Sequence, residues 1–144
     1  MSAFLAITDA VVAALRQAPP VAADIQRGRG IPVVQPKATA ARVSAVQSAA
    51  QPMDLSADTM EWKTAVVVSL YARAAAGQDG EQAIDQLLLA AWTRVQTMAM
   101  PSGVLDVVLD PRVTWDVDEA DQTVVRADIG LSITHLTNGP GLAA

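Results

Sequence analysis

The 144-residue sequence contains no cysteine and a single histidine, His135. Without cysteine, the chain has no disulfide and no thiolate chemistry, and one histidine leaves a zinc ion without its usual set of ligands. No apolar run approaches the ~20 residues of a membrane-spanning helix. Residues 1–15 also lack the basic start of a secretory signal. We therefore expect a protein that is made and works inside a cell.

Sequence motifs for catalysis are missing as well. There is no G-x-S-x-G motif and no Walker pattern, and Gly28-Arg29-Gly30 is not followed by the rest of a dinucleotide fingerprint. Alternation places His135 on the apolar side of a strand, where a buried structural histidine is the ordinary case. We predict no catalytic residue, no cofactor and no metal ligand. A small enzyme or ligand-binding domain, the rival interpretation, would need a polar pocket that the sequence does not display.

Basic residues are scarce in most of the chain, and the net charge is −5. This balance argues against general nucleic-acid binding. Residues 1–50 carry two acidic and five basic residues, whereas residues 51–144 carry thirteen acidic and five basic ones. A solvated surface explains this split, but so do two faces of opposite sign that meet head to tail in an oligomer.

Residues 59–99 form the unit around which the fold is expected to be organised. Apolar side chains alternate along residues 59–73, which predicts a strand with one buried face. Residues 79–99 show an apolar stripe of helical period, with Asp79 at the N-cap position. The strand face and the helix stripe are expected to pack together, with Trp62, Leu88 and Trp92 in the core.

The rest of the chain supplies one more helix and several shorter strands. Ser2 is a plausible N-cap for the opening helix, and Asp110-Pro111 is expected to be a turn. We predict one α+β domain over residues 1–136, a mostly antiparallel sheet of about five strands with two helices packed on one face. Residues 137–144 are expected to be a loose tail. The predicted helix is 2–17, and the predicted strands are 22–27, 41–49, 104–109, 112–118 and 123–136.

Two charged segments are candidate interface sites. Two glycines and two prolines deny residues 28–37 a regular element, so residues 27–42 are expected to form a flexible basic arm. The tip of the last hairpin is acidic, and it lacks the glycine of a typical calcium loop, so a charged docking tip is favoured over a calcium site. The predicted interface residues are Arg27, Arg29, Lys37, Arg42, Asp116, Asp118, Glu119 and Asp121.

Several short motifs, taken in order, resemble a known family. They are Trp62-Lys63-Thr64, Tyr71-Ala72-Arg73, Asp79-Gly80-Glu81, the run from Trp115 to Thr123, and Ile133-Thr134-His135. This order is similar to that of the tail terminator, or tail completion, proteins of long-tailed bacteriophages, typified by the minor tail protein U of lambda-like phages. The similarity covers most of the chain, from the opening helix to His135.

The resemblance implies a structural virion protein that forms a homohexameric ring at the head-proximal end of the tail. Such a ring ends polymerisation of the tail tube protein and offers a surface to the head–tail connector or neck protein. It is assembled in the host bacterial cytoplasm, without a membrane, a cofactor or a specific nucleic acid, although the genome can pass through its lumen. The alternatives are a tail tube or head-completion protein.

Overall fold

A computed structural model of the protein describes residues 1–28, 38–53, 55–56, 58–117, 123–139 and 141–143. It confirms an α+β fold with two helices and five strands among these residues. The elements in chain order are α1 (Ala3–Arg16), β1 (Asp24–Arg27), β2 (Thr39–Pro52), β3 (Thr59–Arg73), α2 (Gly80–Gln96), β4 (Val104–Val117) and β5 (Val124–Asn138).

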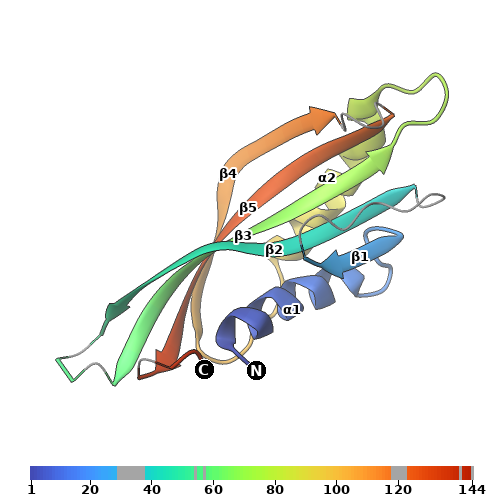
Figure 1. Cartoon of the computed structure of the whole chain (residues 1–144). Helices are drawn as coiled ribbons and strands as arrows, with labels where there is room; N and C mark the ends of the chain where they lie inside the picture. The colour runs from blue at the N-terminus through green and yellow to red at the C-terminus, as the bar shows by residue number, and fades with distance from the viewer. Residues whose placement is uncertain (29–37, 54, 57, 118–122, 140, 144) are drawn as a thin grey trace.

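The five strands form one sheet in the order β1-β2-β3-β5-β4 (Figure 1). β1 pairs with β2 in parallel, and every other neighbouring pair is antiparallel. The central strand β3 has the bounds expected from its alternation. The antiparallel hairpin of β4 and β5 is also confirmed. Because β1 and β4 lie at opposite edges of the sheet, Arg27 at the end of β1 and Asp116 near the end of β4 also lie at opposite edges.

Both helices cover the same face of the sheet. α1 packs over β1 and β2, whereas α2 packs over β3 and β5, and the core lies between this helical layer and the sheet. The Oγ of Ser2 accepts a hydrogen bond from the N–H of Leu5 (3.3 Å), and Asp79 Oδ1 accepts one from Gln82 (2.9 Å), so both predicted N-caps are confirmed. The helical layer covers β4 only in part: Val113 is partly buried against the core, whereas Trp115 and Val117 further along the strand are exposed.

A glycine allows α2 to start close to the sheet. A Cβ atom on Gly80 would lie 2.1 Å from a methyl carbon of Val125 on β5, far inside the van der Waals contact distance. The missing side chain therefore sets how closely the first turn of α2 approaches β5.

Several element boundaries differ from the expectations. β4 runs unbroken through Asp110-Pro111, with register shifts between Val104 and Asp106 and between Leu109 and Val113. The expected turn is wrong because proline is tolerated in an edge strand, where its missing N–H breaks no ladder bond. β5 continues to Asn138, and the carbonyl of Leu142 accepts a hydrogen bond from Ala3 N–H (2.8 Å). β2 is also longer than expected, and α2 ends at Gln96.

The expected core position of three large side chains needs correction. Trp62 is half-buried, and its Nε1 donates a hydrogen bond to Thr137 Oγ1 (2.9 Å) while its ring meets Phe4 edge to face. Leu88 and Trp92 pack against the core but are only partly buried. They lie on the side of α2 that faces Val113 of the edge strand β4, where part of each side chain stays in contact with solvent. In the described part of the chain, no helix has the length and apolarity needed to cross a membrane.

Candidate functional site

His135 is buried near the C-terminal end of β5, and 1% of its surface is exposed. Its Nε2 and the hydroxyl of Thr64 on β3 share a hydrogen bond of 2.9 Å, and the ring of Phe4 lies edge to face at 5.2 Å. Nδ1 has no hydrogen-bond partner among the described residues. Burial lowers the pKa of His135 below the ordinary value for histidine. The side chain is therefore neutral at pH 7, as expected for a structural histidine.

This buried histidine predicts a pH dependence of stability. Since the pKa is lower in the folded state, the unfolded chain binds the proton first, at pH values below about 6.5. The contribution to stability is complete above that pH and is lost as the pH falls toward the folded-state pKa. His135→Asn should weaken the difference in unfolding free energy between pH 7.5 and pH 5. NMR titration of the only histidine gives the pKa directly, and a value at or above 6.5 would contradict the prediction.

Arg27 of the predicted basic site and Asp116 of the predicted acidic site lie at opposite edges of the sheet. Arg27 is the last residue of β1, is exposed, and forms an ion pair with Asp9 of α1. Asp116 is exposed near the end of β4, where its Oδ1 accepts a hydrogen bond from the N–H of Val117 (2.8 Å). The other predicted residues of these two sites, Arg29, Lys37, Asp118, Glu119 and Asp121, lie outside the described residues. Within one subunit, the described residues Arg27 and Asp116 are therefore not close together.

Arg42 is not part of a flexible arm. It belongs to β2, and only 3% of its side chain is exposed. Its Nη2 lies 2.7 Å from Oδ2 of Asp24 on β1, and its Nη1 donates to the carbonyl of Ala41 (3.1 Å). The expected arm of residues 27–42 is therefore wrong at both ends, because pairing with β1 fixes the start of β2.

The face of the sheet opposite the helices carries a polar cluster that the sequence analysis missed. Arg126 on β5 bonds Asp128 through Nε (2.9 Å) and Nη2 (2.8 Å), and its guanidinium lies 5.9 Å from the ring centroid of Tyr71 on β3. The hydrogen bond to Asp128 is the main cause that raises the pKa of Arg126. The outward alternation of β3 and β5 was visible in the sequence, but the register that pairs Tyr71 with Arg126 was not.

An exposed apolar surface is the second feature that was missed. Leu89 is 67% exposed, Trp115 55% and Val117 47%. Trp115 and Val117 pair in register with Ala127 and Val125 of β5, which are buried, so both lie on the side of the sheet that carries the helices, yet both remain exposed. We call this surface the β4–α2 patch: Leu88, Leu89, Trp92, Val113, Trp115 and Val117.

Acidic side chains surround this patch. Two hollows beside α2 and β4 are lined by four acidic residues, Asp79, Glu81, Asp85 and Asp116, and none of the described residues that line them is basic. Apolar side chains ringed by polar ones are typical of a surface that binds another macromolecule.

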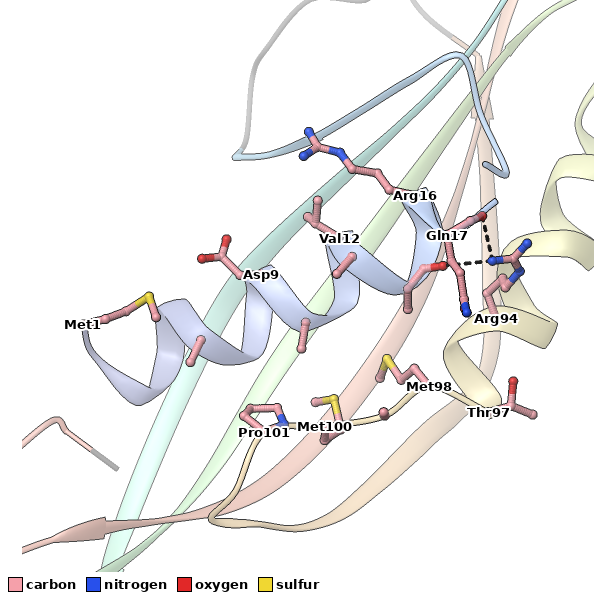
Figure 2. Close-up of a pocket in the computed structure, with 15 residues that line it drawn as sticks. Met1, Asp9, Val12, Arg16, Gln17, Arg94, Thr97, Met98, Met100 and Pro101 are labelled. Carbon is pink, nitrogen blue, oxygen red and sulfur yellow. Dashed lines mark hydrogen bonds between the residues drawn. The ribbon is translucent and has the colours of Figure 1, made fainter. Parts of the chain in front are cut away.

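A groove of about 1140 Å³ runs along α1, between this helix and residues 97–101. Its walls are the outer surface of α1 and the connection that follows α2 (Figure 2). Arg94 of α2 closes one end by donating hydrogen bonds to the carbonyls of Gln17 (2.9 Å) and Pro19 (2.8 Å), where cations suit the C-terminal end of α1. We call this the α1 groove; its apolar lining includes Ala6, Ala10, Ala13, Ala14, Met98 and Met100.

Over the described ranges, no three side chains of histidine, cysteine, aspartate or glutamate lie close enough together to hold a metal ion. The candidate sites are therefore surfaces that could contact another protein: the β4–α2 patch, the α1 groove and the charged edges of the sheet.

Comparison with known proteins was informative at the level of the fold. No protein-family model and no curated protein sequence matches the chain. A solved structure described as the virion of a native gene transfer agent (GTA) particle contains a chain that superimposes with a TM-score of 0.61 at 16% identity. The match covers 92% of this chain and 96% of that one. The two chains therefore share one fold over nearly their whole lengths.

Proposed function

We propose that this chain is a structural protein of a phage-like virion. The observation that carries the proposal is the fold, which is shared over almost the full length of both chains with a component of a gene transfer agent particle. The sequence motifs that resemble those of phage tail proteins also support a structural virion protein, and this support is independent of the fold comparison. No catalytic role is proposed, because the described surfaces suggest contacts between proteins rather than chemistry.

Within the virion, we propose the role of a tail terminator. In this role, copies of the chain form a hexameric ring at the head-proximal end of the tail, contact the tail tube protein below and present a surface to the head–tail connector. The motifs behind the resemblance lie at β3, at the start of α2 and at the hairpin of β4 and β5. The opposite charges at the two edges of the sheet support association between copies.

Deletion of the gene for this chain from the genome that encodes the phage or particle tests this role. A terminator stops tube growth, so its loss should give tails longer than normal and heads without tails, and a plasmid copy should restore normal particles. Electron microscopy of negatively stained particles measures tail length and joining. A tube subunit would instead leave no tails at all, and normal particles without the chain would exclude both roles.

The segment between β1 and β2 is proposed to contact a partner in the particle. Arg27 is already paired with Asp9, and Arg42 is buried against Asp24, so the charge test belongs at Arg29 and Lys37. Reversing both charges should leave the melting temperature of the subunit unchanged, because the sequence predicts a loop at both positions, and substitutions in a surface loop usually change stability by less than ~0.5 kcal/mol. The same change should reduce the fraction of heads joined to tails of normal length. Normal infectious particles would show that the segment is an ordinary solvated loop.

A further inference from the structure

The β4–α2 patch exposes large apolar side chains that no described element of the subunit covers. Leu89 lies on α2, whereas Trp115 and Val117 lie on the edge strand β4. Scattered apolar residues are normal on a protein surface, but a joined group on two elements is typical of an interaction site. Met53 and Leu55, by comparison, lie at the distant turn between β2 and β3.

We propose that the β4–α2 patch of one subunit packs into the α1 groove of a second copy of this chain. The proposal rests on the ring-forming function proposed above and names the two surfaces that meet in the ring. The patch offers bulky, protruding groups such as Leu89 and Trp115. The groove offers the small side chains of α1 and the adaptable methionines Met98 and Met100.

The charges around the two surfaces are complementary. Four acidic residues line the hollows of the patch, and none of the described residues that line them is basic. The groove is lined by two basic residues, Arg16 and Arg94, and by one acidic residue, Asp9. A patch packed against a second patch would instead bring eight carboxylates together, and such juxtaposition of like charges is costly.

The geometry of this contact suits a ring. The patch lies at the β4 edge, and the groove lies along α1, which packs on the same face of the sheet but over β1 and β2, toward the other edge. Since the two surfaces are different parts of one chain, the contact is head to tail. Such a contact leaves an open row of copies with one free patch at one end and one free groove at the other, until a rotation between copies closes the ring.

Cysteine crosslinking tests the contact, because the natural chain has no cysteine to interfere. One variant carries Leu89→Cys in the patch, and a second variant, with a size tag, carries Ala13→Cys in the groove; both positions are exposed. The variants are mixed, or co-expressed during particle assembly, and treated with a short bismaleimide. We expect a crosslinked heterodimer from the mixture and no dimer from either variant alone. Lys63→Cys, exposed on the face without helices, replaces Leu89→Cys as the matched control and should give none.

Other outcomes overturn the proposal. Leu89→Cys crosslinked to itself would show that patch meets patch, and Leu89→Cys crosslinked to a different virion protein would assign the patch to that protein. Images of particles could show a ring of this chain although Leu89→Cys and Ala13→Cys give no crosslink. That result would place the contact between copies on other surfaces, and the proposed terminator role would stand. Heterodimers of the purified protein, together with particle images that show the chain along the tube, would support the contact and reject the terminator role.

Discussion

Replacing Ile129 with alanine is expected to lower the free energy of unfolding by about 2–5 kcal/mol. Ile129 lies on β5, is completely buried, and pairs in register with Val68 of β3 on one side and Val113 of β4 on the other. It belongs to the cluster that also includes Ile84 and Leu87 of α2. The substitution leaves a cavity that the strands on both sides prevent from closing. Urea unfolding followed by far-ultraviolet circular dichroism measures the change.

Trp92→Ala is the matched control for this prediction. A fully buried tryptophan would cost about 3–5 kcal/mol on removal, but Trp92 is only half-buried beside β4. We therefore expect a loss of ~1–3 kcal/mol, since less apolar surface is returned to water. A larger loss for Trp92→Ala than for Ile129→Ala would mean that β4 and α2 pack more closely than the structure shows.

Much of this fold could be predicted from local sequence patterns. The alternation in residues 59–73 gave the bounds of β3, and side-chain chemistry at Ser2 and Asp79 gave both N-caps. These features depend on neighbours within a few positions in the chain. The break expected at Asp110-Pro111 failed because the effect of a proline depends on whether its strand lies at an edge, and position in a sheet is not a local property.

The candidate site was less accessible from the sequence. Alternation showed which side of the sheet Trp115 and Val117 would face, but not whether a helix would lie above them. That depends on where α2 crosses the sheet, which is fixed in part by the close approach of Gly80 to Val125. The α1 groove has the same origin, because its two walls come from segments about eighty residues apart, such as Ala14 and Arg94. Opposite charges in the two parts of the chain were visible, but the surfaces between which they could act were not.

Arg42 shows how a correct observation on composition led to a wrong site. It was grouped with nearby basic residues, yet the parallel pairing of β1 with β2 sets Arg42 beside Gln26 in register and within reach of Asp24. Pairing between strands joined by a long connection cannot be inferred from residue spacing. The outcome is a partly buried ion pair at one edge of the sheet.

Arg42→Met is expected to lower the free energy of unfolding by about 3 kcal/mol. The change removes the positive charge that faces Asp24, whose side chain is only 12% exposed, and breaking a buried pair at one partner leaves the other charge uncompensated. It also removes the donors to the carbonyls of Asp24 and Ala41. The long apolar side chain of methionine keeps most of the packing, so the measured loss reports mainly on the charge.

Arg126→Met provides the comparison on the same face of the sheet. Arg126 also pairs with an aspartate, at 2.8 Å, but its side chain is 41% exposed and that of Asp128 is 26% exposed. Exposed ion pairs typically contribute about 0–1 kcal/mol, so this variant should unfold close to the unsubstituted protein. Adding Asp24→Leu to Arg42→Met should recover part of the loss, because it removes the uncompensated carboxylate. Equal losses for Arg42→Met and Arg126→Met would show that burial does not strengthen the Arg42–Asp24 pair.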